Sequence, residues 1–145
     1  MLLSTILKNK TSNVISVRPD TSITQVVSVL AEKRIGAVLV IDANEKLVGI
    51  LSERDIVRTL AVHAGNTLQM TAAQLMTPSP TVTSPDATVV DAMQIMSDGR
   101  FRHLPVVQSG KLIGLVSIGD IVKARIDQQA HEVDSLRAYV VGAVA

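Results

Sequence analysis

The sequence contains no cysteine and almost no aromatic side chains. Without cysteine, the chain cannot form disulfide bonds, a thiolate nucleophile or a cysteine-based metal site. Phe101 and Tyr139 are the only aromatic residues, which argues against single-stranded nucleic-acid binding because that function relies on aromatic stacking. The core must therefore be aliphatic. Hydrophobic residues make up 47% of the 145 residues, enough for one domain of ordinary size or two small repeats that share a core.

Net charge and long apolar runs are also scarce. The chain has 14 basic and 13 acidic residues, a balance that predicts neither nucleic acid nor an anionic membrane as a partner. The longest aliphatic run, residues 35–41, is too short to span a bilayer. The lysines of residues 1–10 follow the apolar residues, whereas a signal peptide would place them first. We expect a soluble, cytoplasmic protein.

An internal repeat organises the sequence. Residues 17–41 align without a gap with residues 83–107. After a loop that is one residue longer in the first copy, "GILSERDIV" at 49–57 matches "GLVSIGDIV" at 114–122. Both stretches keep a glycine, a serine and an aspartate at the same spacing, so the serine and the aspartate must serve either the fold or a ligand.

Each repeat predicts the element order β-α-β-β-α. Ser22 and Gln25 have the spacing of a capping box, and Thr88 and Asp91 resemble it. Apolar residues then recur at helical spacing, namely Ile23, Val26, Val27 and Leu30 in the first copy and Val89, Ala92, Met93 and Met96 in the second. Two β-rich runs follow in each copy. A second helix then starts at a serine, with Ile56, Val57 and Leu60, or Ile121 and Val122, expected to face inward.

The domain boundaries follow from the repeat. Residues 1–66 are predicted to hold the first repeat with an N-terminal helical segment, 67–127 the linker and the second repeat, and 128–145 a helical tail. One unit of this size buries too little surface to be stable alone, so two are expected to pack sheet to sheet. The tail carries an apolar stripe at Val133, Leu136 and Val140. This stripe could dock on its own domain or on a partner chain.

The repeat unit resembles a cystathionine β-synthase (CBS) domain, and the two together resemble a CBS pair, or Bateman module. The matching features are Pro-Asp before the first helix, "RHLPVV" at 102–107, and the Ser-x-x-Asp frames at 49–55 and 114–120. The likeness covers about residues 3–127. The tail is similar to that of small stand-alone bacterial CBS-pair proteins, often labelled as related to inosine monophosphate dehydrogenase. The implied fold is α/β (α+β), with two repeats about a pseudo-twofold axis, sheets facing each other and helices outside.

The resemblance implies a regulatory module that binds adenosine-containing ligands in two clefts between the repeats. We expect an adenine nucleotide, AMP first, with ADP, ATP, NAD(H) or S-adenosylmethionine as alternatives, and no catalytic cofactor. A homodimer and a separate regulated protein are also expected. One alternative is a structural dimerisation module with vestigial sites. Inosine monophosphate dehydrogenase activity is rejected, because that chemistry needs a cysteine nucleophile and a large barrel, and the chain has no cysteine.

Two interpretations apply to the Ser-x-x-Asp frames. Ser52 with Asp55, and Ser117 with Asp120, could cap a helix start by satisfying its free backbone N–H groups. Alternatively, each carboxylate could bind a ribose, because its two acceptor oxygens suit two adjacent hydroxyl groups. The repeat and the resemblance favour ribose binding for Asp120, whereas Asp55 is balanced between the two. A serine can cap a helix whose N-terminus also attracts a phosphate.

A basic cluster precedes one strand of the second repeat. Arg100, Arg102 and His103 could form a solvated basic turn. The resemblance instead implies that the basic pair Arg102-His103 reaches ligand phosphates and that Pro105 lies beside the adenine. Arg100 and Leu104 are also expected among the nucleotide-binding residues. Arginine can grip a phosphate with two hydrogen bonds. Proline cannot donate to a sheet ladder, so Pro105 should lie at an edge or a bulge.

The first repeat departs from this pattern. Gly36 and Ala37 stand where the second repeat has its basic pair, and Arg54 aligns with Gly119. We therefore expect two unequal sites. Arg54 is hypothesised to lean across the pseudo-twofold toward a ligand phosphate. The remaining histidines, His63 and His131, show no metal-ligand spacing, so no metal site is expected.

Overall fold

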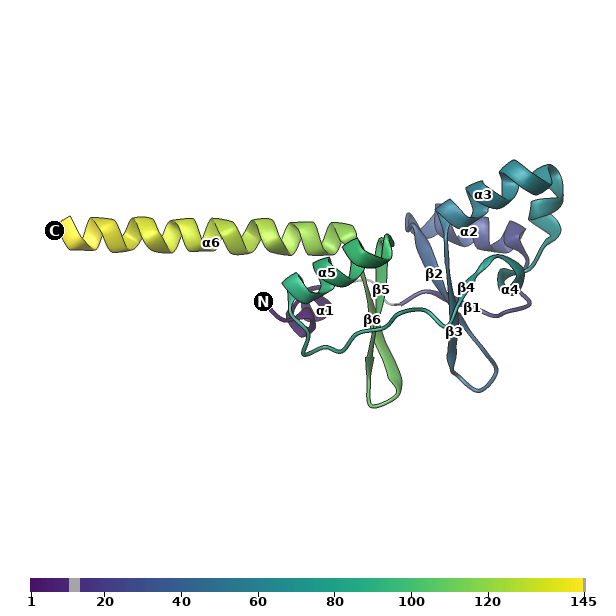
Figure 1. The fold of residues 1–145 in the computed structure, drawn as a ribbon, viewed down its shortest axis with the longest axis horizontal. Helices are drawn as coiled ribbons and strands as arrows, with labels where there is room; N and C mark the ends of the chain where they lie inside the picture. The colour runs from purple at the N-terminus through teal and green to yellow at the C-terminus, as the bar shows by residue number, and fades with distance from the viewer. Residues whose placement is uncertain (11–13, 145) are drawn as a thin grey trace. The chain divides into compact units, whose positions relative to one another are not determined.

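The computed structural model describes residues 1–10 and 14–144, with side chains up to residue 142. The chain forms two compact units, one of Met1–Ser12 with Val82–Ala145 and the other of Asn13–Thr81. This division differs from the boundaries expected from the sequence, because the N-terminal segment folds with the second repeat and most of the linker folds with the first. The mixed α/β class is confirmed for each unit (Figure 1).

The unit 13–81 follows the predicted order and then adds the linker. Its elements are β1 (Ser16–Val17), α2 (Ile23–Lys33), β2 (Ala37–Ile41), β3 (Leu47–Ser52), α3 (Glu53–His63), the 3-10 helix η1 (Ala64–Gln69), α4 (Ala72–Leu75) and β4 (Thr77–Pro78). Four strands form one sheet in the order β1-β2-β3-β4, with β1 and β2 parallel and the other pairs antiparallel. The short helix expected near residues 71–76 is confirmed as α4.

The other unit repeats the plan with fewer strands. It contains α1 (Leu3–Asn9), α5 (Val89–Gly99), β5 (His103–Gln108), β6 (Lys111–Ser117) and α6 (Ile118–Val144). Strands β5 and β6 form an antiparallel pair. A parallel bridge between Thr83 and Val106 takes the place that β1 has in the first repeat.

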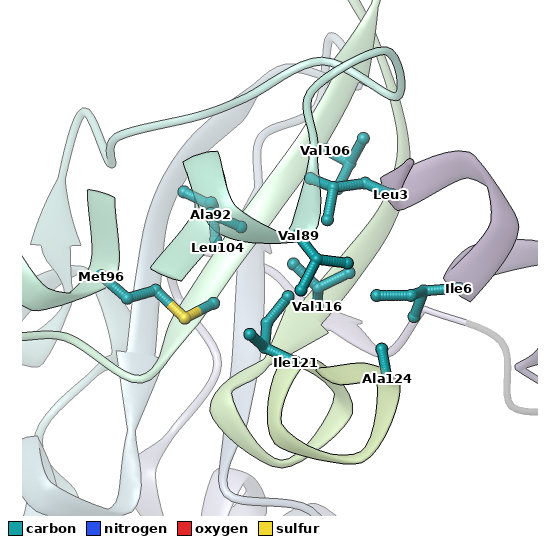
Figure 2. Close-up of a cluster of buried hydrophobic side chains, with 10 residues drawn as sticks. All are labelled: Leu3, Ile6, Val89, Ala92, Met96, Leu104, Val106, Val116, Ile121 and Ala124. Atoms are coloured by element: carbon teal, nitrogen blue, oxygen red, sulfur yellow. The ribbon is translucent and has the colours of Figure 1, made fainter. Parts of the chain in front are cut away.

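The core of this second unit is aliphatic, as the composition requires. Figure 2 shows ten buried side chains from α1, α5, β5, β6 and α6 that converge on one another: Leu3, Ile6, Val89, Ala92, Met96, Leu104, Val106, Val116, Ile121 and Ala124. Helix α1 joins this core through Leu3 and Ile6, and the Leu3 N–H donates to the Ala87 carbonyl at 2.9 Å. The burial of these two side chains explains why the N-terminal segment belongs to the second repeat.

The predicted helix starts are confirmed with one difference. Thr88 and Asp91 exchange both hydrogen bonds of a capping box at α5. At α2, the Ser22 hydroxyl accepts from the Gln25 N–H at 3.3 Å, but the reciprocal Gln25 side-chain bond does not form.

Some side chains expected in the core face outward instead. Val57 is 64% exposed, Leu60 40%, Met93 40% and Val122 48%, and Val27 is also exposed. Their neighbours Ile56, Met96 and Ile121 are buried as predicted. A helix that lies on one sheet buries only a narrow stripe, so the flanking apolar positions stay outside.

The structure also differs from the prediction of a separate helical tail at residues 128–145. The tail is not a separate helix, because α6 runs unbroken for 27 residues from Ile118 to Val144 (Figure 1). Val133, Leu136 and Val140 are 48%, 63% and 52% exposed, so the stripe does not dock on its own unit.

Candidate nucleotide-binding half-sites

The first Ser-x-x-Asp frame forms a complete capping box at the start of α3. The Ser52 N–H donates to Asp55 Oδ2 at 2.9 Å, and the Asp55 N–H donates to Ser52 Oγ at 3.4 Å. The Ser52 hydroxyl adds a 3.0 Å bond to the same carboxylate oxygen. The Asp55 side chain keeps 18% of its surface exposed. The carboxylate is therefore fixed in place while part of it faces solvent.

The structure brings the other first-repeat residues to this helix start. Ala37 pairs with Ser52 across β2 and β3, and the Gly36 carbonyl accepts from the Glu53 N–H at 2.9 Å. Arg54 is exposed, so its guanidinium is free to reach an anion. Arg58 Nη1 lies 3.8 Å from Asp55 Oδ1, at the long end of ion-pair range.

The second frame repeats this geometry at the start of α6. The Ser117 N–H donates to Asp120 Oδ2 at 2.9 Å, and the Asp120 N–H donates to Ser117 Oγ at 3.1 Å. The capping interpretation is thus confirmed for both frames. Ribose binding stays a prediction, and the two roles are compatible because a capped carboxylate retains unused acceptor capacity.

Lys10 distinguishes the second frame from the first. Its Nζ lies 2.8 Å from Asp120 Oδ2 and also donates to the Leu115 carbonyl at 2.8 Å. The exposed side-chain fractions of Lys10 and Asp120 are 28% and 23%, so the ion pair is largely shielded from water. A ligand that approaches Asp120 therefore meets a fixed cation as well as a carboxylate.

This environment lowers the pKa of Asp120 below its ordinary value. Burial is the largest single influence and would raise the pKa, because it disfavours the charged form. The hydrogen bonds from Lys10 and Ser117, together with the positive charge of Lys10, outweigh burial. Asp120 is consequently ionised at neutral pH, as ribose binding requires.

The predicted basic cluster lies partly at this helix start. His103 pairs with Ser117 across β5 and β6, and the Arg102 carbonyl accepts from the Ile118 N–H at 2.8 Å. The Arg102 side chain is exposed. Arg100 ends α5 in a left-handed conformation, with φ of 56°. These contacts place the backbone of residues 102–103 beside Ser117.

The two apolar residues of the cluster have structural roles. Leu104 is fully buried in the core of its own unit, and its contact with a ligand stays a prediction. The Pro105 carbonyl accepts from the Thr83 N–H at 3.0 Å. Pro105 therefore directs its backbone toward Thr83 and away from β6, which explains how β5 tolerates a proline.

Sequence reasoning found most residues at the two helix starts but missed Lys10 and Arg58, whose side chains lie 2.8 Å from Asp120 and 3.8 Å from Asp55. Lys10 precedes the repeat and lies 110 residues from Asp120, so neither the repeat nor a local motif marks it.

Within residues 1–10 and 14–144, no helix is long and apolar enough to cross a membrane.

Comparison with known proteins assigns the family. The CBS domain model matches residues 6–62 and 72–127. The mitochondrial CBS domain-containing protein CBSX3 of Arabidopsis thaliana is 35% identical over 128 residues, which are 85% of this chain and 62% of that protein. The chain thus spans about three fifths of the length of this relative.

Solved structures of CBS proteins share the fold. A CBS-domain protein from Agrobacterium tumefaciens is 40% identical, with a TM-score of 0.83 over 86% of this chain and 92% of that one. CBSX2 in complex with AMP is 30% identical, with a TM-score of 0.73 over 87% and 97%.

A third structure holds other adenosine compounds. The CBS domain pair of protein MJ0100, in complex with 5′-methylthioadenosine and S-adenosylmethionine, is 26% identical, with a TM-score of 0.77 over 88% and 98%. Two matches to the family model, arranged in tandem and covering most of the chain, confirm the resemblance found in the sequence. The chain belongs to the CBS-domain family and carries a tandem pair of CBS domains.

Proposed function

We propose that this CBS pair is a non-enzymatic, cytoplasmic sensor that binds an adenosine 5′-phosphate and signals to a separate protein. The observation that carries the proposal is the pair of matching helix starts, where Asp55 and Asp120 are each held by a capping serine and remain partly exposed. The bound AMP, 5′-methylthioadenosine and S-adenosylmethionine of related CBS structures support an adenosine ligand.

The ribose is proposed to donate its hydroxyl hydrogens to these carboxylates. Hydrogen bonds to a charged acceptor contribute about 1.5–3 kcal/mol each, so a carboxylate fixed in advance contributes strongly to affinity. The ribose is proposed to use Oδ1 of Asp120 or to compete with Lys10 for Oδ2, because Lys10 and the Ser117 N–H already donate to Oδ2.

Lys10 favours a ligand that carries a phosphate. A phosphate near the ribose can accept a hydrogen bond from Nζ when the ribose takes over the carboxylate. A cationic sulfonium would instead be repelled by the same ammonium group. We therefore propose AMP as the ligand of the site at Ser117 and Asp120, with ADP, ATP or NAD(H) as variants of the same chemistry. Arg54 is proposed to bind the phosphate at the site of Ser52 and Asp55.

The role of Lys10 can be tested through the ratio of two affinities. Lys10→Ala leaves Asp120 as an unscreened anion that repels phosphate, and it also removes the competitor of the ribose. We expect the AMP affinity relative to that of adenosine to fall about fivefold, equivalent to roughly 1 kcal/mol for one exposed charge pair. An unchanged ratio contradicts the assignment of Lys10.

A thermal-shift panel tests the function itself. AMP, ADP, ATP, NAD, NADH and S-adenosylmethionine are added separately to the wild type, to Asp55→Asn and Asp120→Asn, and to Asp127→Asn, an exposed acid on α6. A ligand at 100 times its Kd adds about 2.7 kcal/mol of stability. We expect stabilisation of the wild type and Asp127→Asn that is reduced in the two site variants.

The alternative is a structural module whose Ser-x-x-Asp frames only cap helices, and the complete capping boxes make that alternative physically sufficient. It predicts no stabilisation by any member of the panel.

A further inference from the structure

Helix α6 continues far beyond the core that anchors its start. Ala124 is its last buried residue, and every residue from 129 to 142 is exposed. In Figure 1 the helix extends past α1 and α5 of its own unit without a covering element. Within the described part of the chain, the outer half of α6 thus has no packing to stabilise it.

Such a helix is marginal by itself. Short isolated helices are marginally stable in water, and helices in proteins owe most of their stability to the packing of an apolar face. This half of α6 instead exposes Val133, Leu136 and Val140. Residues 126–142 would span about 26 Å at 1.5 Å per residue. A length of apolar helix surface on this scale needs a partner of similar length.

Five of the exposed large apolar residues of α6 follow a heptad repeat, whereas Ile118, Tyr139 and Val141 lie outside it. Counting Ile126 as position a, the a positions are Ile126, Val133 and Val140, and the d positions are Val122, Gln129 and Leu136. Five of these six side chains are apolar, and those five are 48–63% exposed. A spacing of 3.5 residues along one stripe is typical of the seam of a left-handed coiled coil and not of a helix that packs on a sheet.

The residue types specify the arrangement of the partner. Branching at the β-carbon, as in Ile126, Val133 and Val140 at a, favours parallel two-stranded coiled coils when leucine is at d, and Leu136 is the one leucine among the three d positions. Gln129 is the one polar residue of the seam. A polar seam residue reduces stability but selects a register in which it meets its own counterpart.

The flanking charges agree with the same arrangement. Glu132 occupies a g position and Arg137 the following e position. In a parallel, in-register pair, g of one helix faces the following e of the other, so Glu132 of each chain meets Arg137 of the other. An antiparallel pair instead places g positions against g positions, which brings like charges together.

We propose that α6 pairs with α6 of a second copy of this chain in a parallel, in-register coiled coil over residues 122–142. This interface is independent of nucleotide binding. It gives the homodimer that the family resemblance implies a specific interface, formed by the two copies of α6.

The mass of the protein in solution provides the first test. We expect the 15.4 kDa chain to sediment as a dimer. Leu136→Lys should weaken dimerisation by at least ~100-fold, because two buried leucines contribute roughly 1.5–3 kcal/mol each. Ala138→Lys, on the opposite face at position f, should not. Both residues are exposed in the single chain, so neither substitution should impair folding. A monomeric wild type, or a Leu136→Lys variant that dimerises as tightly as the wild type, overturns the proposal.

The absence of cysteine makes the register testable by cross-linking. Leu136→Cys should form a covalent dimer rapidly under mild oxidation, whereas Ala138→Cys should not. Equal rates of covalent dimer formation by the two cysteine variants would contradict the assignment of Leu136 to the helix–helix interface. Glu132→Arg and Arg137→Glu should each weaken the dimer, and the double variant should restore it. A double variant no tighter than the single ones rules out parallel pairing.

Discussion

Replacing Lys10 with alanine removes an ion pair that joins the two chain segments of one folding unit. Lys10 follows α1, and Asp120 lies in the first turn of α6. The variant deletes the 2.8 Å bond to Asp120 Oδ2 and the 2.8 Å bond to the Leu115 carbonyl. The Ser117 N–H still donates to the carboxylate, so Asp120 is left weakly satisfied but not unpaired.

The magnitude follows from the burial of the pair. Exposed ion pairs contribute about 0.2–1 kcal/mol, whereas hydrogen bonds to charged groups contribute about 1.5–3 kcal/mol. With exposed fractions of 28% and 23%, Lys10 and Asp120 lie between these limits. We expect Lys10→Ala to lower the free energy of unfolding at pH 7 by about 1–1.5 kcal/mol, which is a decrease in Tm of about 3–6 °C for a chain of this size.

The stability contribution of the Lys10–Asp120 ion pair depends on pH, and the direction of the Asp120 pKa shift sets the sign of this dependence. The folded-state pKa of Asp120 lies below its unfolded value, so its contribution is fully present above the unfolded pKa, near 3.9. This contribution is lost as the pH falls through the folded pKa, because the protonated carboxyl no longer attracts Lys10. The difference between wild type and Lys10→Ala should therefore be constant from pH 5 to 7 and shrink below about pH 4.

Urea unfolding of both proteins between pH 2.5 and 7 measures this difference. Lys8→Ala is the matched control, because Lys8 is an exposed lysine of α1, two residues before Lys10. The ion pair is refuted as a stabilising contact if Lys10→Ala costs no more than Lys8→Ala at pH 7, or if its cost persists unchanged at pH 2.5.

Three further substitutions test other parts of the structure. Gly114→Ala should lower the free energy of unfolding in urea by about 1 kcal/mol, because the added Cβ would meet Leu7 Cδ2 at 2.5 Å. Gly65→Ala, where the added Cβ meets no atom within 4 Å, should be near neutral by the same urea unfolding. Thr67→Val should raise Tm, since the buried Thr67 hydroxyl has no hydrogen-bond partner among the described residues and an unsatisfied group costs about 1–3 kcal/mol; a lower Tm would contradict this. Arg54→Ala should weaken AMP binding about two- to fivefold in titration calorimetry, as expected for one exposed charge, and unchanged affinity would exclude Arg54 from the half-site.

Local sequence signals predicted the fold because they act over short distances. The capping boxes at Ser52 and Thr88 depend on residues three apart, and the structure forms both. Helix periodicity likewise identified Ile56 and Ile121 as core residues. Periodicity could not set the width of the buried stripe, because the number of neighbours that cover a helix is a property of the tertiary fold. Val57 and Val122 were misplaced for that reason.

The site was predicted where the repeat marks it and missed where it does not. Both aspartates recur in register, but Lys10 has no counterpart in the motif and reaches Asp120 only after α1 packs on the second repeat. Leu104 was expected beside the ligand because of the family resemblance. The structure buries its side chain in the core of its own unit, and ligand contact by Leu104 stays a prediction.

Titration calorimetry of AMP into the wild type, Asp55→Asn and Asp120→Asn tests the central proposal most directly. We expect the wild type to bind AMP, and each variant to lose at least about tenfold in affinity or one binding event per chain, because a charged acceptor contributes about 1.5–3 kcal/mol. Absence of AMP binding by the wild type, or AMP binding that is identical in all three proteins, would contradict the assignment of Asp55 and Asp120 as nucleotide ligands.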